Sequence, residues 1–149
     1  MAIRNAFAVE DKNLSVSTIL TSRKVAYKDI DLTFKNIPLS GEIFKKTEAA
    51  AVKQAVKNLV MTNFGEKPFD PEFGGHVQSL LFELAHEDTE EEIEEQILSA
   101  INRHEPRAVA LSVIAVSNPD RNSVYVTIIF RVVNTQEEVS LSIVLARLR

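Results

Sequence analysis

The tetrapeptide His104-Glu105-Pro106-Arg107 marks a point where the chain must change from helix to strand. Proline fixes its own φ, has no N–H to donate and disfavours helical backbone at the residue before it, so a helix running up to Arg103 must end here. We expect the backbone to be extended through Arg107. Residues two apart in an extended segment point the same way, roughly 6–7 Å apart, which would place Glu105 and Arg107 side by side.

This opposite-charge pair has two interpretations. In the isolated chain we expect it to be solvated, and an exposed ion pair contributes only about 0–1 kcal/mol to stability. A guanidinium held stiffly beside a carboxylate can also bind carbonyl or acidic groups of a partner. The tetrapeptide alone favours the plainer interpretation, a helix stop with incidental charges.

The sequence after the tetrapeptide predicts an antiparallel meander. Three β-rich runs, at 108–117, 123–133 and 138–148, are joined by turn-forming segments at 118–122 and 134–137. Hairpin order then places the first and third runs at opposite edges of the sheet, where backbone N–H and C=O groups lack partners. The third run carries the apolar stretch from Val139 to Leu145.

The middle run is apolar on both of its faces. One face carries Val124, Val126, Ile128, Phe130 and Val132, and the other includes Tyr125, Ile129 and Val133. A sheet with one solvated face should alternate more cleanly. Either the N-terminal segment completes the fold on the second face, or another protein covers it.

Helical patterns precede the tetrapeptide. One helix is predicted from Thr47 until Asn63 and Gly65, with the apolar stripe Val52, Ala55, Val56, Leu59 and Val60. A short second helix is predicted from Val77, Leu80, Leu81 and Leu84. A capping box of Thr89 and Glu92 begins the third, which carries Ile93, Ile97, Leu98 and Ile101. The loop phenylalanines are expected in the core, namely Phe64, Phe69, Phe73 and Phe82.

The chain before the first helix has less pattern. Residues 29–34 alternate, with Ile30, Leu32 and Phe34 on one face, and predict a short strand. Residues 1–26 show no sustained period and are interpreted as an extended arm or an irregular lead-in. The predicted fold class is therefore α+β, in which residues 27–149 form one domain of three helices packed on an antiparallel meander.

Composition argues against several functions. The formal net charge is −4 with dispersed Lys and Arg, so no nucleic-acid or membrane partner is expected, and the absence of cysteine excludes thiol chemistry. The three histidines lack metal-ligand spacing, and we expect neither a metal nor another cofactor. Gly74-Gly75 before a helix could bind an anion, but a turn is the more ordinary role. We expect a protein that is not an enzyme.

An ordered set of motifs resembles one family. The segments 55–66 (AVKNLVMTNFGE), 71–74 (PEFG), 80–83 (LLFE) and Glu105-Pro106-Arg107, with 27–34 (YKDIDLTF) and Gly41, are similar to the baseplate wedge sheath-initiator family of contractile phage tails. The related subunit of type VI secretion systems is TssE, and the family is sometimes labelled lysozyme-like. The resemblance covers about residues 27–148. His104 departs from it, because many relatives carry a bulky aromatic residue there.

The resemblance implies a structural protein of the virion tail baseplate that is assembled in the host cytoplasm. It implies that Glu105, Pro106 and Arg107 bind the wedge core, and that the sheet accepts strands from the first ring of sheath subunits. The edge run supplies Val139, Leu141, Ser142, Ile143 and Leu145 for this contact. Other wedge subunits and the tail tube are the remaining implied partners, with six copies per baseplate.

Two alternatives stay open at this point. A lysozyme-like glycosidase of the baseplate would need a cleft holding two carboxyl groups about 5–9.5 Å apart, and no pair in the sequence is singled out. A free cytosolic adaptor could instead bind peptides on a sheet edge, without a ring-shaped partner.

Overall fold

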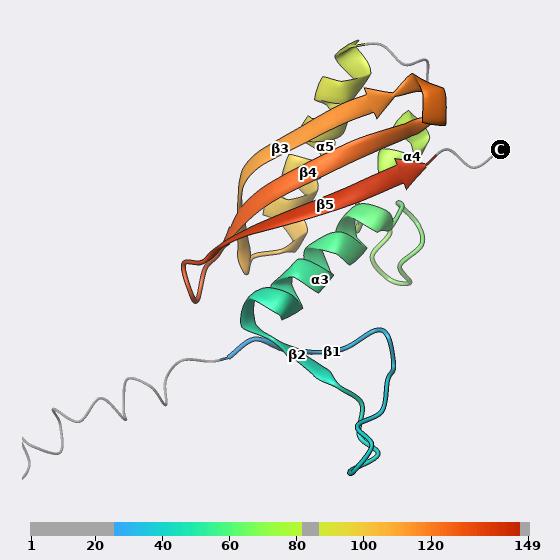
Figure 1. Cartoon of the computed structure of the whole chain (residues 1–149). Coiled ribbons are helices and arrows are strands. Elements are labelled where there is room, and N and C mark those ends of the chain that lie inside the picture. The colour runs from blue at the N-terminus through green and yellow to red at the C-terminus, as the bar shows by residue number, and fades with distance from the viewer. Residues whose placement is uncertain (1–25, 82–86, 147–149) are drawn as a thin grey trace, which may run out of the picture.

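A three-stranded antiparallel sheet forms the centre of the computed structural model, which describes residues 26–81 and 87–146. The strands are β3 (Ala108–Asn118), β4 (Ser123–Val132) and β5 (Glu138–Ala146), in the order β3-β4-β5. A short 3₁₀ turn, η1 (Pro119–Arg121), joins the first two. The predicted meander is thus confirmed, with β3 and β5 at opposite edges (Figure 1). The final residues of the third predicted run, 147 and 148, lie outside the described residues.

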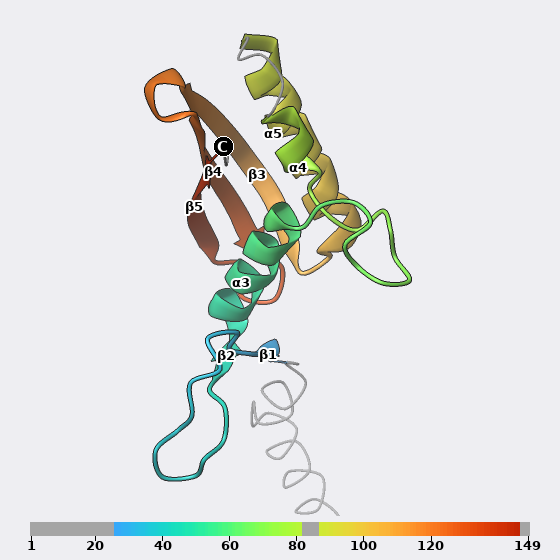
Figure 2. The same ribbon diagram turned by 90° about the vertical axis from the view of Figure 1, so that its right-hand side faces the viewer.

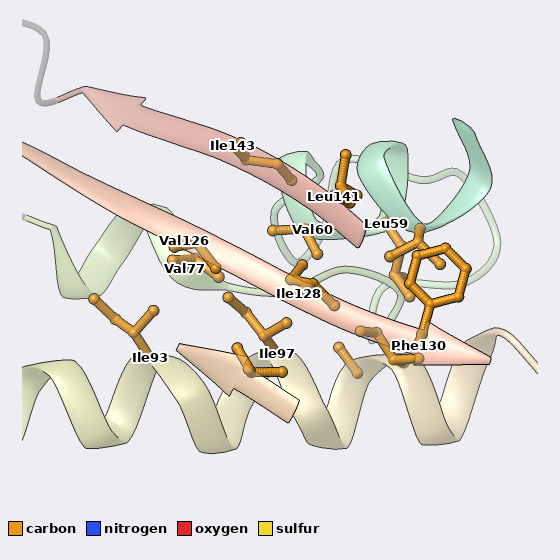
Figure 3. Packing of buried hydrophobic residues seen from close by; sticks show 14 of the residues in the cluster. Leu59, Val60, Val77, Ile93, Ile97, Val126, Ile128, Phe130, Leu141 and Ile143 are labelled. Atoms are coloured by element: carbon orange, nitrogen blue, oxygen red, sulfur yellow. The ribbon is translucent and has the colours of Figure 1, made fainter. Parts of the chain in front are cut away.

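Three helices cover one face of this sheet, as the sequence predicts (Figure 2). They are α3 (Glu48–Met61), α4 (Val77–Leu80) and α5 (Glu87–His104). Apolar side chains from the helices and the inner sheet face form one core, which includes Leu59, Val77, Ile93, Ile97, Val126, Ile128, Phe130, Leu141 and Ile143 (Figure 3). Because β-strand side chains alternate, every second residue of β4 and β5 reaches this core.

The core face of α3 matches its predicted stripe. Val52, Val56, Leu59 and Val60 are buried, and Ala55 is partly buried. Thr47 occupies the N-cap position with extended backbone but makes no side-chain capping bond, and the helix ends at Met61, slightly before the predicted Asn63 and Gly65.

The two glycines after α3 let the chain pass close to the helix end. Gly74 has φ +137°, and a Cβ there would lie 2.4 Å from the carbonyl oxygen of Thr62. The N–H of Gly75 donates to the carbonyls of both Leu59 and Thr62, each at 3.0 Å. These bonds satisfy acceptors left free at the helix terminus, so the structure supports the turn role of this dipeptide.

The predicted strand at 29–34 is largely wrong. The observed strand β1 (Lys28–Ile30) is shorter and pairs antiparallel with β2 (Lys45–Thr47), a strand the sequence did not indicate. After Ile30 the chain turns, because the carboxylate of Asp31 accepts the N–H of Thr33 at 3.0 Å and its carbonyl accepts that of Phe34 at 3.1 Å. Ile30, Leu32 and Phe34 are all exposed and form no buried face.

Two further predictions fail in the region around α4. Phe64 and Phe69 are exposed, although Phe73 packs against the core as expected. Phe64 stacks on His76 with ring centroids 4.5 Å apart. Helix α5 begins at Glu87, which places Thr89 inside the first turn instead of at the N-cap. Phe82 and Leu84 lie outside the described residues.

In the described part of the chain, no helix packs on the outer face of the sheet (Figure 1). Six large apolar side chains on it are between 37% and 54% exposed: Val109, Leu111, Ile114, Val116, Tyr125 and Val144. The mixed pattern predicted for the middle strand therefore corresponds to a real apolar surface in the described part of the chain.

Candidate partner-binding surfaces

The Glu-Pro-Arg segment forms a tight turn between α5 and β3. The N–H of Glu105 donates to the carbonyl of Ile101 at 2.9 Å, which continues the helical pattern, and the N–H of Ala108 donates to the carbonyl of Glu105 at 3.1 Å. Pro106 occupies the second position of this turn, where its fixed φ is favourable. The predicted extended backbone through Arg107 is therefore wrong, because the β-strand begins one residue later, at Ala108.

The Glu105–Arg107 pair is part of the fold and is not a solvated surface pair. Nε of Arg107 donates to Oε1 of Glu105 at 2.7 Å, and Nη2 donates to Oε2 at 2.9 Å. The Glu105 side chain is 9% exposed and that of Arg107 is 26% exposed. A bidentate pair at this depth is stronger than the exposed pair expected from the sequence.

Arg107 also joins two parts of the chain that are distant in sequence. Its Nη1 lies 3.2 Å from Oδ2 of Asp29 on β1, and its guanidinium carbon lies 5.7 Å from the ring centroid of Tyr27. Hydrogen bonding to Glu105 is the main cause that raises the pKa of Arg107, and the charge of Asp29 adds to it. The guanidinium therefore links the β1 segment to the turn between α5 and β3.

Strand β5 presents its outer backbone edge without a partner strand in the described chain. The N–H of Val132 donates to the carbonyl of Glu137 at 2.9 Å, and the β4–β5 register pairs Phe130 with Val139 and Ile128 with Leu141. Hydrogen-bonded and non-hydrogen-bonded pairs alternate in an antiparallel ladder. Ser142, which pairs with Thr127, is therefore at a position whose N–H and C=O point away from β4.

The opposite edge is partly closed by glutamates from α5. Oε1 of Glu94 accepts the N–H of Ala115 at 2.7 Å, and Oε1 of Glu90 accepts the N–H of Ser117 at 2.7 Å. These N–H groups are on the outer side of β3, where an added strand would bind. The two edges thus differ: carboxylates occupy donors of β3, whereas the donor at Ser142 of β5 faces outward.

Two grooves border the β5 edge. The first, which we call the lysine groove, has a volume of about 460 Å³ and is lined by Asp31, Leu32, Thr33, Lys46, Ala50, Lys53, Gln54, Lys57, Asn58 and Leu141. The second, of about 260 Å³, lies toward the end of β5 and is mainly apolar, with Val60, Met61, Val77, Gln78, Leu81, Val144, Leu145 and Ala146. A strand added to β5 would therefore have a groove for its side chains near each end of β5.

The carboxyl group in the lysine groove is poorly suited to acid catalysis. Asp31 accepts the backbone N–H of Thr33, which is the main cause that lowers its pKa, and the nearby Lys46 at 3.5 Å lowers it further. A glycosidase acid requires a raised pKa and a second carboxyl group. Within the described residues there is also no group of three or more His, Asp or Glu that could hold a metal ion.

The predicted site residues thus divide into two surfaces. Glu105 and Arg107 lie in the turn with Pro106 exposed beside them, whereas Leu141, Ile143 and Leu145 point into the core and Val139 is partly buried. In the predicted β5 set, Ser142 is the residue whose side chain is exposed.

Sequence reasoning missed Asp29, Glu90 and Glu94, although the four-residue spacing of the two glutamates on a helix indicates a common face. No described helix has the length and apolarity needed to cross a bilayer.

A paired charged turn, a strand edge without a partner strand in the described chain and an apolar outer sheet face are features typical of proteins that bind other proteins through their surfaces. Comparison with known proteins identifies the family. The profile described as "Baseplate wedge protein gp25" matches residues 46–137, more than half of the chain, so this chain belongs to that family. The resemblance seen in the sequence is confirmed.

One curated relative agrees with this assignment, and two solved structures share the fold. Baseplate wedge protein gp25 of Enterobacteria phage T4 is 29% identical over 113 residues, covering 76% of this chain and 85% of the relative. A subunit in the baseplate of the anti-feeding prophage has a similar fold, with a TM-score of 0.57 and 22% identity over 83% of this chain and 88% of that one. A proposed tail lysozyme from Geobacter sulfurreducens has a TM-score of 0.59 and 23% identity over 65% and 89%.

Proposed function

We propose that this protein is a structural subunit of the baseplate wedge in a contractile tail, and that its β5 edge receives the first strands of the tail sheath. The observation that carries the proposal is the difference between the two sheet edges. Glu90 and Glu94 occupy backbone donors of β3, while the outward N–H and C=O of Ser142 on β5 face no partner strand in the described chain. An extended segment of a partner would pair with this edge by β-augmentation.

The turn at Glu105, Pro106 and Arg107 would serve as the second contact, toward the core of the wedge. Pro106 is exposed. Arg107 has five N–H donors, and one donor on each of Nε, Nη1 and Nη2 already contacts Glu105 or Asp29. The remaining N–H groups of the two terminal nitrogens can donate to carbonyl groups of a partner. Glu105 and Asp29 would then hold the guanidinium in the orientation that binding requires.

This arrangement would place the protein in the virion tail baseplate after assembly in the host cytoplasm. Six copies would match a six-fold baseplate, with other wedge subunits, the first sheath ring and the tail tube as neighbours. Each backbone hydrogen bond adds only about 0.5–1.5 kcal/mol net. Several bonds in neighbouring copies must therefore act together, which keeps a single free subunit from starting a sheath.

A proline at position 142 tests the β5 edge. Because the N–H of Ser142 points away from β4, Ser142→Pro removes a donor for an incoming strand and spares the β4–β5 hydrogen bonds. We expect the variant subunit to enter baseplates that lack sheath in electron micrographs. Ser142→Thr keeps the N–H and is the matched control, which should assemble normal sheath.

Circular dichroism and thermal melting of purified Ser142→Pro should show a folded protein before particles are scored. Normal sheath on particles that contain the proline variant would show that this edge is not the template.

A further inference from the structure

We infer that the segment paired with β5 carries acidic side chains, which bind Lys53 and Lys57 in the lysine groove. This inference rests on the proposed function, because it names the chemistry of the partner that the β5 edge receives. Lys53 and Lys57 are exposed, separated by four residues and therefore on one side of α3.

The groove is positively charged on a protein whose net charge is negative. Its lining includes three lysines and the carboxylate of Asp31, which lies 3.5 Å from Nζ of Lys46. Within the described residues, neither Lys53 nor Lys57 forms an ion pair. In this described part of the chain, two positive charges in a concave site therefore have no neutralising group, while the formal charge of the whole chain is −4.

The geometry of a sheet directs side chains of an added strand toward these lysines. Leu141 points from β5 toward the core and also lines the lysine groove. A strand added outside β5 would lie about 4.8 Å away and continue the same alternation of side chains. Its inward-facing residues would thus pass over the exposed side of α3, beside Leu141, where Lys53 and Lys57 are found.

Carboxylates are the side chains that suit this position. Glutamate or aspartate at alternate positions of the partner would neutralise both lysines, and Asn58 of the same groove offers an amide group for a further hydrogen bond. The backbone bonds to β5 would provide pairing independent of sequence, and the lysines would select acidic segments.

Peptide binding to the full-length protein tests this inference. The probes are two nine-residue peptides, one alternating threonine with glutamate and one alternating threonine with glutamine, and NMR amide shifts of β5 report where each binds. We expect the glutamate peptide to bind about threefold to tenfold more tightly at low salt, with the difference reduced at high salt.

Charge variants separate the lysine groove from general electrostatics. Lys53→Ala with Lys57→Ala should remove the preference for the glutamate peptide. Lys35→Ala with Lys45→Ala changes the net charge equally at exposed residues outside the groove and should retain the preference. Equal affinity for both peptides, or equal loss in both double variants, would overturn the inference.

The same titrations distinguish this inference from the function on which it rests. If both peptides bind equally and Ser142→Pro abolishes their binding, the β5 edge accepts strands and the acidic preference is wrong. If neither peptide shifts the β5 amides at millimolar concentration, both the edge and the preference are overturned.

Discussion

The guanidinium of Arg107 donates two parallel hydrogen bonds, of 2.7 and 2.9 Å, to the carboxylate of Glu105, two residues earlier in the same turn. The same guanidinium reaches Asp29, which is 78 residues earlier in the chain. The motif therefore stabilises the subunit itself, in addition to any role at an interface. A partner would meet a guanidinium that is already oriented.

Arg107→Ala should destabilise the isolated protein. The Glu105 side chain is 9% exposed, and removing its partner leaves a buried carboxylate without its main hydrogen bonds, a loss of roughly 1–3 kcal/mol in the free energy of unfolding. The melting temperature should fall by several degrees, as measured by circular dichroism.

Arg131→Ala is the matched control, because the Arg131–Glu138 pair is 3.2 Å long but largely exposed, and it should change stability by at most about 1 kcal/mol. If the two variants have the same melting temperature, the buried pair adds no more stability than the exposed pair.

Asp31→Asn should destabilise the protein in a pH-dependent way. The folded-state pKa of Asp31 is lowered chiefly by the N–H of Thr33, so the unfolded chain binds its proton more readily. The stabilisation is then present above the ordinary pKa of an aspartate and is lost as the pH falls through the lower folded-state pKa. Urea unfolding of wild type and variant should differ at pH 7 and converge in acid. A constant difference across this range would contradict the assignment.

Purified protein should not hydrolyse peptidoglycan. The groove beside β5 has Asp31 with a lowered pKa, whereas glycoside hydrolysis uses a protonated acid and a second carboxyl group. A turbidity assay and a zymogram with lysozyme as the positive control should show no activity. Activity that disappears when one carboxylate is replaced would favour the lysozyme-like alternative instead.

The parts of the fold that sequence predicted are those with a local period. The alternation in β3, β4 and β5 and the apolar stripe of α3 depend on neighbours within a few residues, and these elements appear as expected. Pairing of β1 with β2 depends on a contact between Lys28 and Thr47 across a long loop, and no local pattern encodes it.

The state of the Glu-Pro-Arg turn depended on long-range contacts as well. Proline correctly predicted the end of α5, but two groups that contact Arg107, the Asp29 carboxylate and the Tyr27 ring, come from a segment far away in the sequence. Spacing along the chain reports none of these contacts. The sequence therefore identified the Glu105–Arg107 pair, and the structure changed its interpretation from a solvated pair to a partly buried one.

Two glutamates of α5 protect the β3 edge. Glu90→Ala with Glu94→Ala should leave the N–H groups of Ala115 and Ser117 without their carboxylate acceptors. A free row of donors on an edge next to an exposed apolar face, which includes Ile114 and Val116, is a template for pairing with another chain. We expect this double variant to lose roughly 1–3 kcal/mol of stability and to self-associate in sedimentation velocity experiments, whereas the wild-type edge pairs less readily.

Helix α5 supplies a matched control for this experiment. Glu91 and Glu95 have the same four-residue spacing and the same charge, but both are exposed. Glu91→Ala with Glu95→Ala should therefore change the net charge equally and leave association unchanged. If the two double variants associate to the same extent, reduced charge repulsion is the cause and the glutamates do not guard the edge. If only Glu90→Ala with Glu94→Ala associates, blocking Ser142 with proline in that background should leave the association intact, because the new contact would use β3 and not β5.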